Sequence, residues 1–211
     1  MALSNPPISS NINENWLFEF TADNQNCLDF DGSNDTISFG NILQSYTDFT
    51  IEFWCKADSI GSGVVIQLSA GSGESEAENV SFNVNLQSGG EFRLFYEYGS
   101  GSNETNTTSN FDLSSNTWTH VAVVRDDASG NALFYKNGVL VETESASNDP
   151  TGGTSSSANM TIGNSFATSN GFDGELAHVR IWNVARSADD ISYYYNRLVD
   201  SNDTGLEGYW K

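Results

Sequence analysis

Apolar and polar side chains alternate through most of this chain with a period of two residues. Residues 49–55 show the pattern clearly, because four apolar side chains there fall on one face. Residues 80–86 and 92–96 repeat it. Such alternation is typical of β-strands that bury one face and expose the other. Further short strands are predicted at 16–20, 28–30, 37–39, 64–68, 118–125, 132–136, 139–143, 160–163, 175–182 and 206–210.

Turn residues separate these strands. Asn137-Gly138 lies between two of them and is the strongest short signal for a two-residue β-hairpin. One helix is predicted from Ser187 to about residue 196 or 197, because Ser187 is a suitable N-cap and Asp189 and Asp190 favour the positive end of the helix dipole. Three longer connections, rich in Gly, Ser, Asn and Thr, are expected to be surface loops: 71–79, 99–110 and 147–158.

Many short strands with almost no helix predict an all-β fold, built as a two-sheet antiparallel β-sandwich. The 211 residues have room for one such domain. We assign residues 1–15 to a flexible N-terminal lead and residues 16–211 to the single domain. No run is long and apolar enough to span a membrane, and the N-terminus lacks the pattern of a secretory signal peptide. We therefore expect no membrane insertion.

Charge narrows the classes of partner. The chain has 28 acidic and 8 basic residues, which gives a net charge of −20. Such a field repels the phosphates of nucleic acids and anionic membranes, so no nucleic-acid partner is expected, whereas divalent cations are favoured. The two cysteines, Cys27 and Cys55, leave open either a disulfide or two buried free thiols, and the thiols are the favoured alternative.

An acidic turn follows the strand at residues 28–30. Asp31, Asn34 and Asp35 surround Gly32 in this turn. Three oxygen donors within five residues, on a loop that glycine can bend sharply, suit a hard cation such as calcium. An ordinary Asx-rich turn has the same composition. Both interpretations remain open at this point.

Evidence for catalysis is weak. Glu74, Glu76 and Glu78 alternate as the carboxylates of some glucanases do, but their small polar neighbours indicate a solvated loop. His120 and His178 have no second histidine or cysteine at metal-binding spacing and no serine in a nucleophile motif, so they are interpreted as structural. We expect no catalytic residue and no enzymatic activity.

Aromatic residues beside the second long loop are candidates for stacking on a sugar. Tyr98 is the best placed, and Tyr96 precedes it on the same predicted face. The alternative is that both tyrosines only cover a face of a sheet. The side chains that can hydrogen-bond to a sugar nearby are Asn83, Asn85, Arg93, Asn103 and Asn106.

Four segments, in this order, resemble the laminin-G-like, concanavalin A-like jelly-roll family. They are LDFDGSND (28–35), FTIEFWCK (49–56), WTHVAVVR (118–125) with LFYKNG (133–138), and FDGELAHVRIWN (172–183). The resemblance extends over residues 16–211 and implies two antiparallel sheets stacked as a jelly roll. It also implies a non-catalytic module of the kind found in adhesins, receptors and polysaccharide-degrading enzymes, frequently with bound calcium.

The family's metal site implies a wider set of calcium ligands in this chain. On this resemblance, Asp173 and Glu175 join Asp31, Asn34 and Asp35. The family usually has another acidic residue after the position of Leu176, where this chain has Ala177-His178.

Together these observations predict a calcium-stabilised, carbohydrate-binding module of a larger secreted or cell-surface protein, with flanking domains in the same chain. Its expected partner is a glycan or another cell-surface ligand. Two alternatives stay open: a protein- or peptide-binding adhesion domain, and a spacer domain without a ligand of its own.

Overall fold

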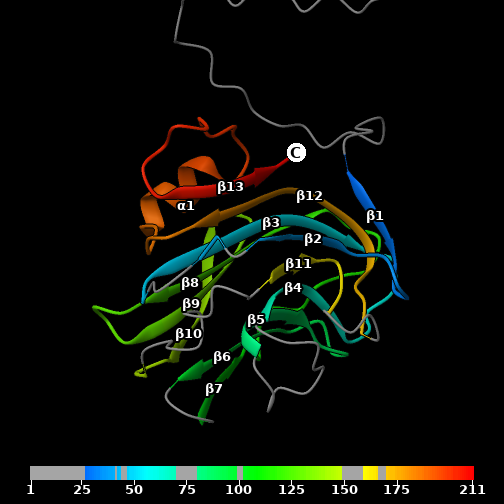
Figure 1. The fold of residues 1–211 in the computed structure, drawn as a ribbon, viewed down its shortest axis with the longest axis horizontal. Helices are drawn as coiled ribbons and strands as arrows, with labels where there is room; N and C mark the ends of the chain where they lie inside the picture. Colours follow the sequence, from blue (N-terminus) through cyan, green and yellow to red (C-terminus); the bar gives the residue numbers. More distant parts are fainter. Residues whose placement is uncertain are drawn as a thin grey trace, which may run out of the picture.

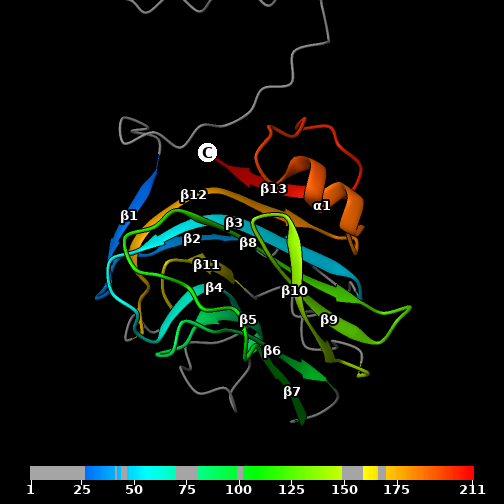
Figure 2. The same ribbon diagram turned by 180° about the vertical axis from the view of Figure 1, so that it is seen from behind.

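Two antiparallel sheets form the layers of a β-sandwich (Figures 1 and 2). The computed structural model describes residues 27–40, 42–43, 47–69, 80–98, 102–148, 159–165 and 170–211. The seven-stranded sheet has the order β1 (Leu28–Asp31), β12 (Asp173–Trp182), β3 (Phe49–Ala57), β8 (Thr119–Asp126), β9 (Asn131–Lys136), β10 (Val139–Ser145), with β13 (Leu206–Trp210) also paired to β12. The six-stranded sheet has the order β2 (Ile37–Gly40), β11 (Asn159–Ile162), β4 (Gly63–Ser69), β5 (Val80–Leu86), β6 (Phe92–Tyr98), β7 (Ser102–Thr107). The expected all-β jelly-roll sandwich is confirmed.

The main core lies between the inner faces of the two sheets. Strand alternation places Phe53 of β3 and Phe92 of β6 there, and both side chains are fully buried. Their rings meet edge to face with centroids 5.8 Å apart. Phe49 and Phe82 also join the two layers, but their rings are stacked, with centroids 5.4 Å apart. Burial of such a side chain contributes about 1.5–3 kcal/mol, so the alternating apolar positions are what hold the layers together.

Helix α1 (Ala188–Tyr194) covers the outer face of the seven-stranded sheet (Figure 2). Its buried Ile191 packs in a second, smaller apolar cluster with Ala122 and Val124 of β8. Ser187 is the N-cap, as predicted, and its hydroxyl accepts a hydrogen bond from the backbone N–H of Asp190 at 3.1 Å. The helix ends at Tyr194, slightly earlier than expected.

Most of the predicted strands are present, and one loop prediction was wrong. Residues 102–107, expected to lie in a surface loop, form strand β7 at the edge of the six-stranded sheet. The predicted hairpin between β9 and β10 is confirmed, since Asn137 and Gly138 both have positive φ angles, 51° and 79°. The predicted strand at 16–20, the acidic run 74–78 and the boundary at residue 16 lie outside the described residues.

The two cysteines are free thiols, which was the favoured alternative. Cys55 is buried in the main core, and burial raises the pKa of its thiol. Cys27 is partly buried, and its Sγ lies 3.5 Å from Oε2 of Glu175. No helix within the described ranges is long and apolar enough to cross a membrane.

Candidate functional site

Polar side chains cross the outer face of the six-stranded sheet. The strand register places Asn85 of β5, Arg93 of β6 and Thr107 of β7 side by side. One step along the strands, Asn83 and Thr105 flank Phe95 on the same face. We call the set Asn83, Asn85, Arg93, Thr105 and Thr107 the polar strip.

The polar strip is partly buried and partly open. Asn83 and Asn85 are at most 4% exposed, Arg93 is half-buried, and Thr105 and Thr107 are exposed. With the amide of Asn85 turned to the orientation that its neighbours favour, its oxygen accepts from Nη2 of Arg93 at 3.0 Å and its nitrogen donates to Oδ1 of Asn83 at 3.0 Å. The strip is therefore a connected row of donors and acceptors that reaches solvent at β6 and β7.

Strand alternation separates the predicted sugar-binding residues. Tyr96 and Asn106 lie on the core-facing side of their strands and are 0% and 4% exposed. The hydroxyl of Tyr96 accepts from Nε of Arg125 at 3.3 Å, and the amide of Asn106 donates to the carbonyl of Ser145 at 2.7 Å. These two residues pack inside the sandwich instead of facing a ligand, which corrects their assignment.

The remaining predicted residues divide between the two faces. Tyr98 continues the core-facing alternation of Tyr96 at the end of β6 and is half-buried there. Asn103 pairs with Glu97 in the register, but its side chain is outside the described part. Of the residues expected to contact a sugar, Asn83, Asn85 and Arg93 lie in the polar strip with described side chains. Thr105 and Thr107 escaped prediction because their segment was interpreted as a loop.

A second candidate site lies where the β1–β2 turn meets the start of β12. Asp31 and Asp173 are direct cross-strand partners, and a cavity of about 200 Å³ opens beside them. Oδ1 of Asp31 accepts from the backbone N–H of Ser33 at 2.8 Å, and Oδ2 of Asp173 accepts from the hydroxyl of Ser59 at 2.7 Å. We call Asp31, Gly32, Ser59 and Asp173 the acidic corner.

Gly32 makes the acidic corner possible. Its φ is 71°, and a Cβ atom there would lie 2.9 Å from Cβ of Asp173. Only glycine combines this backbone conformation with so close an approach. The sharp turn expected from the sequence is therefore the feature that brings Asp31 next to Asp173.

The other predicted calcium ligands lie around the acidic corner rather than in it. Oδ2 of Asp35 accepts from the backbone N–H of Asp31 at 3.2 Å, and Asn34 is exposed. Glu175 forms an ion pair with Lys56 at 2.8 Å, and this hydrogen bond raises the pKa of Lys56. Within the described ranges, no three acidic, histidine or cysteine side chains are grouped as metal ligands.

The acidic corner fits a hard cation in part. Two carboxylates directly opposite each other on neighbouring strands repel, so a cation between them would relieve the repulsion. Their oxygens are the ligand type that calcium takes, but six to eight ligands are usual. Asp31 and Asp173 therefore supply a nucleus for such a site, and backbone carbonyls and water would have to complete it.

A buried cluster of charges lies on the outer face of the seven-stranded sheet. Glu52 contacts Nε2 of His120 at 3.3 Å, Nη1 of Arg180 at 3.5 Å and Nη1 of Arg186 at 2.8 Å. Each of the four residues is 8% exposed or less. Burial alone would raise the pKa of Glu52, but the nearby His120 and the two arginines outweigh it and lower the pKa to about 2.

This charge cluster fastens α1 and the following segment to the sheet. Nη1 of Arg180 donates to the carbonyl of Tyr194 at 3.0 Å, which satisfies a carbonyl at the helix end. A β-bulge in β12, at His178 with a φ of 50°, sets the direction of Arg180. Burial lowers the pKa of His120, so its ring is neutral at pH 7. The geometry agrees with a structural role for both histidines.

The chain belongs to the concanavalin A-like lectin/glucanase superfamily, whose family model matches residues 31–192. No curated protein sequence matches the chain.

Solved structures with the same fold come from several sources. A heptameric SAP-like pentraxin from Limulus polyphemus is 18% identical, with a TM-score of 0.62 and 86% of each chain covered. A putative carbohydrate-binding protein from Bacteroides ovatus is 18% identical, with a TM-score of 0.61, over 87% of this chain and 52% of that one. The CBM40 of a Ruminococcus gnavus sialidase, bound to α2,3-sialyllactose, is 12% identical, with a TM-score of 0.64, over 80% and 95%. At these identities the likeness establishes the fold alone.

Proposed function

We propose that this domain is a non-catalytic carbohydrate-binding module of a larger extracellular or cell-surface protein, and that it presents the polar strip to a glycan. The observation that carries the proposal is the row of amide, guanidinium and hydroxyl groups that reaches solvent at Arg93, Thr105 and Thr107. Sugar hydroxyls both donate and accept, so they pair with such a mixed set. The carbohydrate-binding proteins that share this fold support the same conclusion.

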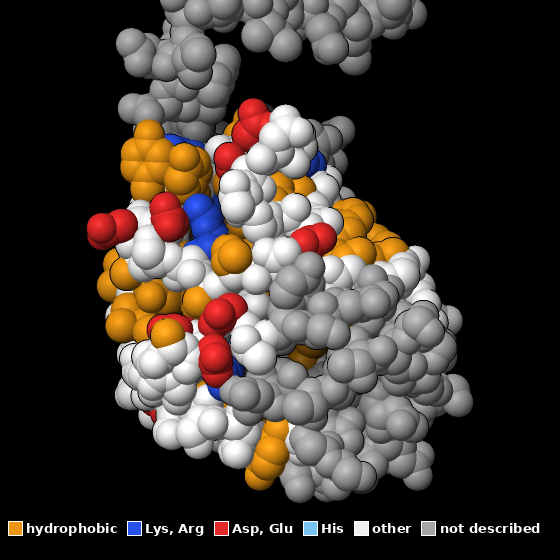
Figure 3. Space-filling view, turned by 60° about the vertical axis from the view of Figure 1, so that its left-hand side comes forward, with side chains coloured by type: hydrophobic (Ala, Val, Ile, Leu, Met, Phe, Trp, Pro, Cys, Tyr) orange, Lys and Arg blue, Asp and Glu red, His pale blue; other side chains and the backbone are white. Residues whose placement is uncertain are grey.

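The charge of the chain selects the class of glycan. The net charge of −20 repels polyanions. On the face seen in Figure 3, apolar and acidic side chains are interspersed, and the described side chains there form no broad basic patch. The charge of the chain therefore favours a neutral glycan.

Calcium at the acidic corner is the second part of the proposal. Asp31 and Asp173 would hold the ion, because their two negative charges face each other across neighbouring strands and attract a cation. When bound, calcium ties the β1–β2 turn to the start of β12. A site with few carboxylates suits an extracellular module, for which dissociation constants are about 10⁻⁴–10⁻³ M.

The glycan proposal is tested with an array of neutral oligosaccharides and two variants. We expect Arg93→Ala to weaken binding by about tenfold, because it removes a charged donor. Thr107→Val keeps the shape of the side chain and removes its hydroxyl, and a smaller loss is expected. The matched control is Thr143→Val, an exposed threonine on β10 of the other sheet.

Two results would reject this assignment. If no neutral glycan binds, the domain is not the proposed module. If a glycan binds but Arg93→Ala and Thr107→Val bind it as the unaltered chain does, the polar strip is not the binding surface.

One observation favours a second candidate function, a protein-binding adhesion domain. Val139 and Leu140, beside the β9–β10 turn, are 65% and 45% exposed, and Tyr193 and Leu198 are also exposed. Exposed apolar side chains of this size are typical of protein contact surfaces when they form a patch. A silent glycan array would make this the leading candidate.

A further inference from the structure

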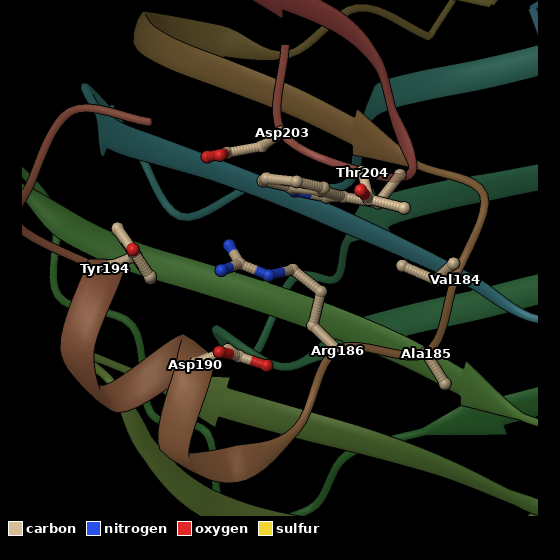
Figure 4. A pocket seen from close by; sticks show the side chains of 8 residues that line it. Val184, Ala185, Arg186, Asp190, Tyr194, Asp203 and Thr204 are labelled. Carbon is tan, nitrogen blue, oxygen red and sulfur yellow. The ribbon is translucent and has the colours of Figure 1, made fainter. Parts of the chain in front are cut away.

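A pocket lies on the side of the sandwich opposite the polar strip. It opens between α1, the end of β12 and the segment around Asp203 and Thr204, and its volume is about 250 Å³ (Figure 4). Trp182, Arg186 and Tyr194 also line it, together with Asp190. None of these residues belongs to the polar strip or the acidic corner.

Arg186 is held firmly inside this pocket. Its side chain is 7% exposed, Nη1 donates to Oε1 of Glu52 at 2.8 Å, and its backbone N–H donates to the hydroxyl of Thr50 at 2.9 Å. The guanidinium carbon lies 4.0 Å from the ring centroid of Trp182 and 5.2 Å from that of Tyr194. In the part of the chain that the structure describes, its other guanidinium nitrogens have no acceptor.

Acceptors flank the guanidinium. Figure 4 shows the end of Arg186 between Asp190 and Asp203, pointing toward Tyr194. Oδ2 of Asp190 accepts from the hydroxyl of Ser187, and Oδ2 of Asp203 accepts from the backbone N–H of Asp200. The second oxygen of each carboxylate has no partner among the described residues. The pocket thus offers donors, acceptors and an aromatic ring within one cavity.

This combination selects a ligand by charge. A ligand with a negative charge meets Asp190 and Asp203 and is repelled, and the charge of Arg186 is already compensated by Glu52. A neutral polyol can accept from Arg186, donate to both carboxylates and pack its carbon face on Tyr194. Pockets for drug-sized ligands have about 300–1,000 Å³, so this smaller one has room for a single ring.

We propose that the Arg186 pocket binds one neutral monosaccharide unit. The site goes beyond the proposed function because it uses the other face of the domain and depends on neither the polar strip nor calcium. Arg186 positions the sugar by hydrogen bonds, and Asp190, Asp203 and the hydroxyl of Thr204 fix the orientation of the ring.

The test is a titration of the full chain, labelled with ¹⁵N, followed by NMR. The probes are glucose, galactose, mannose and N-acetylglucosamine, with glucuronic acid as the anionic analogue. We expect at least one neutral sugar to give saturable shifts at the indole N–H of Trp182 and the backbone amides of Asp203 and Thr204. Glucuronic acid should give none in the same concentration range.

Variants separate this site from the polar strip. Asp203→Asn and Tyr194→Ala should each weaken the sugar by at least about fivefold, since each removes one of its contacts. Tyr193→Ala, on the next residue of α1 and outside the lining, is the matched control. Melting temperatures of all three variants show whether the fold is kept.

The outcomes distinguish the two proposals. Shifts confined to Asn85, Arg93 and Thr107 would overturn the pocket and leave the glycan proposal in place. Unchanged affinity in both Asp203→Asn and Tyr194→Ala, or an absence of any saturable shift at the pocket, would overturn it as well. Pocket shifts together with a silent oligosaccharide array would retain the pocket and reject the polar strip.

Discussion

The two outer faces of the sandwich bury polar groups in different ways. On the seven-stranded sheet, Glu52 is surrounded by Arg180 and Arg186, so charge compensates charge inside the fold. On the six-stranded sheet, Asn83 and Asn85 are neutral and almost equally buried. A buried ion whose partner is lost is costly, whereas an amide can exchange one hydrogen-bond partner for another. Glu52 on the first face is therefore fixed by its charged partners, whereas the amides of the second face are suited to exchanging protein contacts for ligand contacts.

Substitution of Glu52 is expected to have the largest effect, and it tests whether the two faces bury polar groups differently. Glu52→Gln leaves two arginines buried without their counter-charge, and we expect a loss of about 3–5 kcal/mol in the free energy of unfolding. Gln67→Met, at a buried amide of the other sheet, is the matched control and should cost less than about 2 kcal/mol. Denaturant titrations measure both, and equal losses would contradict the distinction between the faces.

Calcium removal tests the acidic corner, where a bound ion rather than a side chain would neutralise the carboxylates of Asp31 and Asp173. If calcium occupies the acidic corner, a chelator should lower the melting temperature, and saturation at one hundred times the dissociation constant corresponds to about 2.7 kcal/mol. Asp173→Asn should abolish this response, because it removes one of the two facing carboxylates. Glu175→Gln should retain it, since Glu175 is already paired with Lys56. If neither the chelator nor added calcium changes the melting temperature, the acidic corner does not bind calcium.

Lowering the pH should reduce the stability of the domain mainly through His178 and Glu52, which both lie in the seven-stranded sheet. Burial, with Arg180 second, lowers the pKa of His178 from 6.5 to about 4, so only the unfolded chain takes up this proton just below pH 6.5. Stability therefore falls as the pH drops from 6.5 toward 4. Glu52, with its pKa lowered from 4.5 to about 2, adds a second loss below pH 4.5. Melting curves between about pH 7 and about pH 3 follow both windows.

A single variant isolates the contribution of His178 to the upper window, in which the lowered pKa of His120 also acts. His178→Asn removes the titrating ring, and asparagine tolerates the positive φ of this position. We expect a shallower decline in melting temperature between pH 6.5 and pH 4 in this variant. If the decline is as steep as in the unaltered chain, His178 does not carry it.

The smallest expected effect concerns Tyr98. It continues the core-facing alternation of β6, so Tyr98→Ala should lower stability by about 1 kcal/mol and leave glycan binding unchanged. The glycan array compares it with Arg93→Ala. A loss of binding in Tyr98→Ala alone would move the proposed surface from the polar strip to the end of β6.

The sequence predicted the strands that contribute to the core, and it failed where no apolar pattern exists. β3 and β6 were found because their core-facing apolar residues recur at every second position. β7 was missed because an edge strand with Asn, Glu and Thr has the composition of a loop. The same period would have separated Arg93 from Tyr96, since adjacent odd and even positions of a strand face opposite sides.

The sites depend on contacts that no local pattern contains. The acidic turn was visible in the sequence, and the family resemblance placed Asp173 beside it, but the ion pair that engages Glu175 was not foreseen. The bond between Arg186 and Glu52 joins residues 134 positions apart, and the pocket follows from it. Long-range register and side-chain direction decide these arrangements, and only the folded chain supplies them.

The extra residue in β12 reverses which positions of this strand face the core. Before His178, Leu176 faces the core, and after it Val179 and Ile181 do, so the even-numbered positions change sides along one strand. Without the bulge, strict alternation from Leu176 through His178 would turn Arg180 inward among phenylalanine and valine side chains and push Ile181 outward. A one-residue insertion after His178 would exchange the inward and outward positions in the second half of the strand, so such insertions, usually tolerated in loops, are expected to be excluded here in any functional descendant of the chain.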